Sequence, residues 1–221
     1  MIRISYSLRR DSPLYPGTPP LLITSDKSLD RGDSSNSSVF ALSSHSTTHL
    51  DMPLHFCPSG HSVSDLPGDE LVFFPTYCLD VPKKDDECIA DYDIPSSLAI
   101  HSDAEALLIK TGYSHFRLCG NDKYTHHHPW VHPDLPEYLR NVFPHLKLVC
   151  FDILSVSVPG HRHEGQKTHK SFLCGSPPIL ILEDANLSDR IAVNKKYFLR
   201  IYPWIFEDTD GVPVLAFLSE K

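Results

Sequence analysis

Residues 45–55 read His-Ser-Thr-Thr-His-Leu-Asp-Met-Pro-Leu-His, and this stretch combines two patterns. From Leu50 to Phe56 the even positions are all apolar, whereas the odd positions include Asp51 and His55, with His49 just before them. Alternation with a period of two predicts an extended segment with one buried face and one polar face. We therefore expect a strand that presents histidine and carboxylate side chains together.

The spacing of these polar residues indicates a metal site. His49 and Asp51 would lie about 7 Å apart along an extended chain, so their side chains can converge on one ion. His45 has the same parity but would lie roughly 13 Å from His49 in an extended chain, so the chain should turn within residues 46–48 or form a single helical turn there. Two histidines and one carboxylate leave coordination positions open for water. His55, on the same face, is expected to be a general acid or base.

Composition limits the possible partners. The 221 residues suit one domain, 1–221, with 41% apolar and 22% charged residues. The net charge of −8 argues against nucleic acid and anionic membranes, which require an excess of Lys and Arg. Neither an apolar run of about 20 residues nor a signal-peptide pattern is present, so we expect a cytoplasmic protein. The six scattered cysteines are expected to be reduced thiols rather than disulfides.

The rest of the chain is typical of a mixed α/β protein with more strand than helix. Residues 134–141 predict a short amphipathic helix. Residues 26–38 and 157–170 are polar and are expected to be loops. Glu183 follows directly on an apolar run, which places its carboxylate at the end of a strand. Apolar runs rich in Val, Ile and Phe predict strands at 39–42, 71–74, 77–81, 106–109, 146–153, 178–182, 198–205 and 212–218. The order of strand 106–109, helix and strand 146–153 is typical of a βαβ crossover.

Residues 45–55 resemble the His-x-Gly-Thr-His-x-Asp-x-Pro-x-His signature of the cyclase family of metal hydrolases, which includes bacterial kynurenine formamidase and isatin hydrolase. Thr47 takes the place of the signature glycine, so the turn lacks that residue's freedom at positive φ. The resemblance implies an α/β domain of the swivelling β/β/α type, with a mixed sheet or barrel-like β core and flanking helices. Other segments that resemble the family are 6–8, 15–17, 65–67, 107–112, 151–156, 183–187 and 208–214.

The resemblance also implies a pair of metal ions held by distant parts of the chain. The first ion would take both signature histidines and the aspartate, and Asp51 would bridge to the second. A later histidine and a later glutamate would complete the second site, and the best matches are His169 and Glu183. His161 and His163 remain alternatives to His169. Histidine and carboxylate ligands suit zinc, with manganese as an alternative.

Two further roles come from the resemblance: His55 matches the proton carrier, and Tyr15 matches an aromatic residue that lines the substrate pocket. The implied activity is hydrolysis of an amide, formamide or cyclic amide or ester by metal-activated water. The arylformamidase reaction, from N-formylkynurenine to kynurenine and formate, is the first expectation. Alternatives are an isatin or lactone hydrolase, a non-hydrolytic cyclase or dehydratase, and a non-catalytic metal-binding protein. The expected partners are a small-molecule substrate and further copies of the chain, as a dimer or tetramer.

Overall fold

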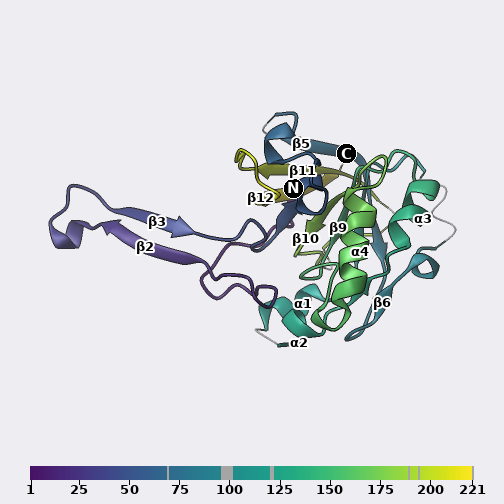
Figure 1. The fold of residues 1–221 in the computed structure, drawn as a ribbon, viewed down its shortest axis with the longest axis horizontal. Helices are drawn as coiled ribbons and strands as arrows, with labels where there is room; N and C mark the ends of the chain where they lie inside the picture. Colours follow the sequence, from purple (N-terminus) through teal and green to yellow (C-terminus); the bar gives the residue numbers. More distant parts are fainter. Residues whose placement is uncertain (69, 96–101, 120–121, 189, 194, 221) are drawn as a thin grey trace.

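A closed barrel of strands forms the centre of the molecule. The computed structural model describes residues 1–68, 70–95, 102–119, 122–188, 190–193 and 195–220. Within these ranges the barrel strands are β4 (His49–Asp51), β5 (Leu71–Asp80), β7 (Ala106–Lys110), β9 (Leu148–Phe151), β10 (Leu180–Glu183), β11 (Lys196–Pro203) and β12 (Gly211–Glu220). They pair in the order β12-β11-β5-β7-β9-β10-β4, and β4 pairs back to β12, which closes the barrel (Figure 1). The short β1 (Ile2–Arg3) also pairs with β12.

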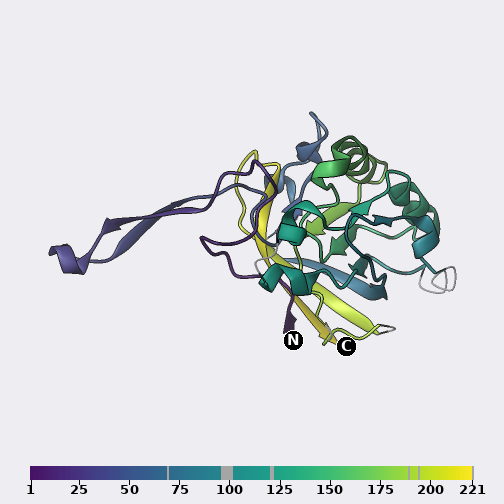
Figure 2. The same cartoon turned by 90° about the horizontal axis from the view of Figure 1, so that it is seen from below.

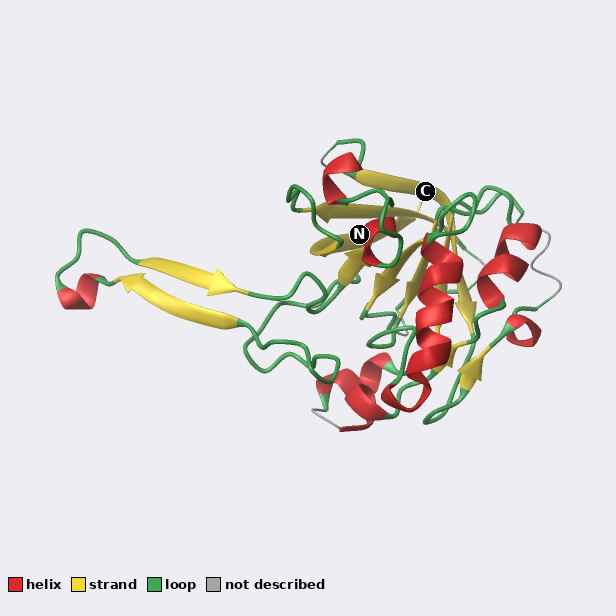
Figure 3. Ribbon diagram, in the orientation of Figure 1, coloured by secondary structure: helices red, strands yellow, loops and turns green. Residues whose placement is uncertain are grey.

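Helices connect the parallel part of the barrel. β5, β7, β9 and β10 are parallel to one another, and parallel neighbours need a crossover connection. Between β7 and β9 lie α1 (Ser114–Leu118), α2 (Asp122–His126) and α3 (Leu135–Val142), and between β9 and β10 lies α4 (Arg162–Leu173). Figure 3 shows α3 and α4 on one side of the barrel. The predicted βαβ crossover is confirmed, and so is the α/β class with a barrel-like β core and flanking helices.

Alternating side chains of the parallel strands divide the core into two clusters. In β7, Ala106 and Leu108 join a cluster to which all the barrel strands contribute, so this cluster fills the barrel interior. Leu107 and Ile109 point the other way and join a cluster that includes Phe172 of α4. Because both faces of these strands are buried, they read as continuous apolar runs, which is why the sequence predicts them well.

A two-stranded arm stands away from the barrel. Its strands, β2 (Leu22–Lys27) and β3 (Ser37–Ala41), pair with each other, and the 3-10 helix η1 (Leu29–Arg31) lies at the tip. Figures 1 and 2, which differ by a 90° turn, both show the arm extending from the body. The sequence predicted a strand at 39–42 and a loop at 26–38. It missed β2, because the segment Leu-Ile-Thr-Ser-Asp-Lys has only two apolar side chains and they are adjacent.

Several short elements complete the described part of the chain. β6 (Cys88–Ile89) pairs with β8 (Trp130–Val131). The remaining 3-10 helices are η2 (Pro53–His55), η3 (Val63–Asp65), η4 (Asp91–Asp93) and η6 (Pro159–His161). A search of the described residues finds no helix that is both long and apolar enough to cross a membrane.

Some local predictions are wrong, and others are confirmed. The strand expected to continue to Phe56 ends at Asp51, and η2 follows, because Pro53 lacks the N–H that a further strand pair would need. Residues 157–170 are not a loop, since α4 begins at Arg162. Residues 71–74 and 77–81 belong to one continuous strand, β5. The helix predicted over 134–141 is confirmed as α3.

The expectation of reduced thiols is confirmed for Cys78, Cys88, Cys119 and Cys150 and is wrong for the other two cysteines. Cys57 and Cys174 form a disulfide between residues 117 positions apart in the sequence. One lies just after η2 and the other directly after α4. The bond therefore ties the segment that carries His55 to the helix that carries His169. A pairing over this distance leaves no local spacing pattern, which explains why it was not predicted.

Candidate metal centre

The predicted turn between His45 and His49 is present. Thr47, at the position of the signature glycine, has φ of 56°, the left-handed region that favours glycine. For a β-branched residue this conformation costs on the order of 1–3 kcal/mol, so the surroundings have to hold it in place. The turn folds the chain back on itself and leaves the His45 and His49 ring centroids 5.0 Å apart.

A buried polar network holds this turn. Arg117 donates to the Thr47 hydroxyl at 3.1 Å and makes a two-point ion pair with Asp184 at 2.6 and 2.7 Å. Tyr124 also donates to Asp184, at 2.6 Å. The Thr48 hydroxyl donates to the Asp184 backbone carbonyl. The network thus secures a strained residue directly beside the candidate ligands.

Strand pairing places the next two candidate ligands. β4 is antiparallel to β10, and in this register Glu183 lies opposite His49. The distance from His49 Nε2 to Glu183 Oε2 is 3.4 Å, and that from His49 Nε2 to Asp51 Oδ1 is 3.3 Å. Leu50, between them in β4, points into the barrel interior. The candidate site therefore lies on the outer face of the barrel, at the end of β10.

Helix α4 supplies His169, although the sequence placed this residue in a loop. Gly165, Thr168, His169 and Phe172 are buried with the helical spacing of three and four residues. His169 Nε2 lies 3.7 Å from Asp51 Oδ2 and 3.6 Å from Glu183 Oε1.

The two alternatives to His169 lie outside the cluster. His161 stacks on Trp130 with ring centroids 4.3 Å apart, and His163 is exposed. Neither lines the pocket, whereas His169 does.

The atoms left without partners fit a cation. His49 Nδ1 donates to the Thr47 carbonyl at 2.8 Å, and His169 Nδ1 donates to the Gly165 carbonyl at 2.7 Å, so each Nε2 lone pair is free. Among the described residues, His49 Nε2 and Asp51 Oδ2 are buried and make no hydrogen bond. Buried polar atoms without partners are costly, and imidazole nitrogen with carboxylate oxygen is the donor set that suits zinc or manganese. The residues therefore fit a divalent ion.

The charges of the cluster lead to the same conclusion. Burial and the nearby Asp51 carboxylate would raise the pKa of Glu183, but His169 and His49 lower it to about 2. Burial would likewise raise the pKa of Asp51, yet His45 and His49 hold it well below its usual range. Two buried carboxylates are thus anionic at neutral pH and need positive charge, either from protons on the histidines or from a bound cation.

Asp210 joins the cluster, and no role was predicted for it. Its Oδ2 accepts a hydrogen bond from His55 Nδ1 at 2.8 Å and lies 2.9 Å from His45 Nε2, while the Ser44 hydroxyl donates to Oδ1. His45 Nδ1 lies 2.9 Å from Asp51 Oδ1. Burial would lower the pKa of His45, but its hydrogen bonds to Asp210 and Asp51 raise it to about 9. The only sequence signal for Asp210 was its place in the matching segment 208–214.

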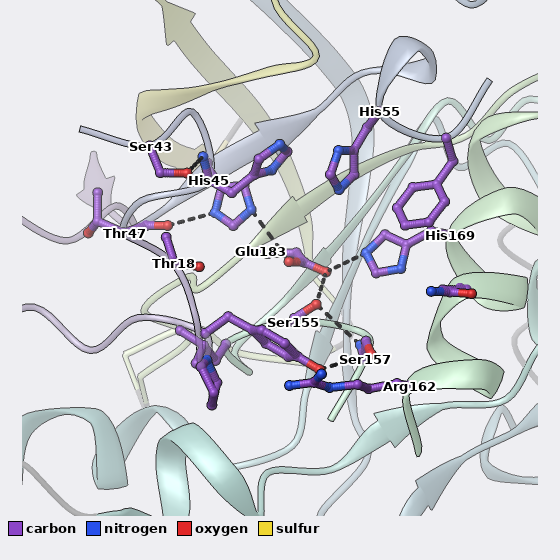
Figure 4. Close-up of a pocket in the computed structure, with 16 residues that line it drawn as sticks. Thr18, Ser43, His45, Thr47, His55, Ser155, Ser157, Arg162, His169 and Glu183 are labelled. Carbon is purple, nitrogen blue, oxygen red and sulfur yellow. Dashed lines mark hydrogen bonds and ion pairs between the residues drawn. The ribbon is translucent and has the colours of Figure 1, made fainter. Parts of the chain in front are cut away.

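A cavity of about 360 Å³ opens over this cluster (Figure 4). Of the predicted site residues, all but the buried Asp51 line it. Tyr15 lies on its wall, where the phenol and the Ser157 hydroxyl are 3.4 Å apart. Phe56 and Leu154 add apolar surface, and Figure 4 shows Arg162 beside Ser157, across the cavity from His55. The arrangement provides a polar, acidic floor, a histidine at one side and an apolar wall.

Comparisons with known proteins agree with this geometry. Residues 2–158 match the family model described as "Putative cyclase". A kynurenine formamidase from Bacillus thuringiensis subsp. konkukian is 30% identical over 220 residues, covering 99% of this chain and 96% of the relative. A similar relative from Bacillus cereus is also named kynurenine formamidase and is 30% identical over 216 residues, or 97% of this chain and 95% of its own.

The fold is shared with solved structures of lower sequence identity. Isatin hydrolase A from Labrenzia aggregata superposes with a TM-score of 0.80 at 18% identity, covering 100% of this chain and 93% of that one. A predicted metal-dependent hydrolase from Bacillus stearothermophilus superposes with a TM-score of 0.73 at 24% identity, covering 98% and 96%. The family model matches most of this chain, and relatives that are 30% identical align with nearly all of it. This chain therefore belongs to the cyclase family.

Proposed function

We propose that this protein is a metal-dependent hydrolase that cleaves a C–N bond other than a peptide bond. The observation that carries the proposal is the buried cluster of His49, Asp51, His169 and Glu183, with unpartnered donor atoms facing one another beneath a cavity. His45 completes the proposed ligand set. The kynurenine formamidase relatives support the same reaction type.

A divalent cation bound by these residues supplies Lewis acidity, which polarises a carbonyl group and lowers the pKa of water. The protein's own contribution to proton transfer comes from His55. Because its Nδ1–H is donated to Asp210, its Nε2 is the basic nitrogen, and His55 lines the cavity. His55 therefore takes a proton from the attacking water and returns one to the leaving amine.

For the substrate we propose an aryl formamide that carries a carboxylate, as N-formylkynurenine does. Tyr15, Phe56 and Leu154 offer apolar surface to an aromatic ring. Arg162 lines the same cavity, and no carboxylate of the described residues lies within ion-pair distance of its guanidinium. A guanidinium in this position would bind a substrate carboxylate in a two-point pair. A neutral ring such as isatin would make no use of it.

The test compares three substrates with the zinc- or manganese-loaded enzyme: N-formylkynurenine, formanilide and isatin. We expect N-formylkynurenine to be hydrolysed with the highest kcat/KM. Arg162→Met should raise KM for N-formylkynurenine at least tenfold and leave formanilide unaffected. Lys167→Met is the matched control, since Lys167 is exposed on the same helix and does not line the cavity. Turnover of isatin alone would refute the substrate, and no hydrolysis of any amide or lactone by the metal-loaded enzyme would refute the reaction class.

A further inference from the structure

The Cys57–Cys174 disulfide lies beside two histidines that line the catalytic cavity. Cys57 follows His55 by two residues, and Cys174 comes directly after α4, the helix that carries His169. The ring centroids of His55 and His169 are 5.8 Å apart, and both rings line the cavity. The covalent link therefore spans from the proposed proton carrier to a proposed metal ligand.

Packing aside, little else fastens the segment of residues 53–60 to α4. Among the residues that the structure describes, no hydrogen bond or ion pair joins residues 53–60 to residues 162–174. The backbone hydrogen bonds of the segment run to its own residues and to its immediate neighbours in the chain, and the His55 side chain bonds to Asp210. The disulfide is thus the bond that holds the segment against the helix.

Phe56 connects the disulfide to the metal cluster. Its ring stacks on the His169 imidazole, with centroids 4.6 Å apart and planes 18° apart, and it meets the His55 ring edge-on at 4.6 Å. His169 donates its Nδ1–H to the Gly165 carbonyl, one turn back on its own helix, so Phe56 is the support that comes from outside α4 on that face of the ring. Because Cys57 is the next residue, a closed disulfide fixes where the Phe56 ring can lie.

Small thiols in solution can reach this disulfide. Cys174 is exposed and Cys57 is partly buried. Exposed disulfides are the ones that exchange readily, because a thiolate has to reach one of the two sulfurs. A solvent thiolate attacks Cys174 Sγ and releases the Cys57 thiolate. A second thiolate then attacks the external sulfur of the mixed disulfide and releases the Cys174 thiolate. The two external thiols end as a disulfide, and their two electrons and two protons pass to the cysteines; the reverse sequence closes the bond.

We propose that the Cys57–Cys174 pair is a redox switch for metal binding, which solvent thiols open and their disulfides close. The closed pair holds Phe56 against His169, and the cluster then binds its ion tightly. The open pair leaves Phe56 on a segment that no other bond fastens to α4, and the cluster binds the ion more weakly. This inference rests on the metal site of the proposed function and adds a means of regulating it.

The experiment measures the zinc dissociation constant of full-length, initially metal-free protein by competition with a chelating dye. Thiol reductant is removed without air before the titration. The reduced wild type should bind zinc roughly 10- to 100-fold more weakly than the oxidised protein, as is typical when a group that orients a metal ligand is lost. Oxidised glutathione should restore the affinity. A variant with both Cys57→Ala and Cys174→Ala should stay in the weak state under all conditions. Cys119→Ala is the control and should respond as the wild type does, since Cys119 is exposed and unpaired.

Two further measurements test the route through Phe56. Phe56→Leu keeps the disulfide but loses the ring stack, so it should bind zinc weakly in both redox states. Amide hydrogen exchange of the metal-free wild type should become faster on reduction in residues 53–60 and in the last turn of α4, and change less in the barrel strands.

Several results would overturn the proposal. They are equal zinc affinity in the two redox states, an affinity that re-oxidation does not restore, a full redox response in Phe56→Leu, and a uniform change in hydrogen exchange. A reduced protein that circular dichroism shows to be unfolded would also overturn it, because the link would then hold the fold rather than the site. A wild type that binds no zinc in either state would refute the proposed function and this inference with it.

Discussion

Asp210 gives the sharpest prediction about the proton-transfer machinery. Its Oδ2 holds His55 Nδ1 at 2.8 Å, and a hydrogen bond to a charged group contributes about 1.5–3 kcal/mol. Without it, His55 loses both its orientation and the tautomer that leaves Nε2 basic. Since about 1.4 kcal/mol corresponds to a factor of ten in rate, Asp210→Ala should lower kcat roughly 10- to 150-fold. KM should change little, because Asp210 does not line the cavity.

The assay is hydrolysis of N-formylkynurenine by protein whose metal content is measured in parallel. Metal should be retained, since His49 and Glu183 are untouched. The kcat of Asp210→Asn should lie between those of the wild type and Asp210→Ala, because the amide oxygen still accepts a hydrogen bond but carries no charge. Asp208→Asn, an exposed position in the same loop, is the control and should leave kcat unchanged. An Asp210→Ala variant that keeps both its metal and its full kcat would show that Asp210 does not position His55.

Two predictions concern stability and are read by urea unfolding. Arg117→Met leaves Asp184 buried without its ion-pair partner and should lower the free energy of unfolding by about 3–5 kcal/mol. Arg9→Met breaks an exposed ion pair and should have little effect on the free energy of unfolding. Equal losses in the two variants would contradict the role of the Arg117 network. Cys174→Ser removes the link to Cys57 and should lower the free energy of unfolding by roughly 2–5 kcal/mol. A reducing agent should destabilise the wild type by a similar amount and should have no effect on the Cys174→Ser variant. A wild type that reductant leaves unchanged would argue against the disulfide.

The sequence predicted the parts of the site that rest on local geometry. The alternation around Leu50 placed His49 and Asp51 on one polar face, and the distance from His45 required a turn that the structure contains. The barrel strands were visible because strands buried on both faces read as apolar runs. Glu183 was named as a ligand through the family resemblance, and its predicted place at the end of an apolar run agrees with β10.

The parts that were missed depend on tertiary contacts. His55 was expected on a continuing strand, but Pro53 ends the strand and η2 carries His55 to the site instead. Helix α4 is largely polar, so its buried positions, spaced by three and four residues, were mistaken for a loop. Asp210 reaches His55 because Gly211 pairs with Asp51 across β12 and β4, a contact that no local pattern reveals.

The metal itself is the central claim, and metal analysis of purified protein tests it most directly. Wild-type protein, stripped with a chelator and reloaded with zinc or manganese, should bind one or two ions per chain and hydrolyse an aryl formamide only when loaded. His49→Ala removes a buried donor between Asp51 and Glu183, and it should lose metal and activity together. Turnover by the stripped wild type, or by His49→Ala without bound metal, would contradict the account.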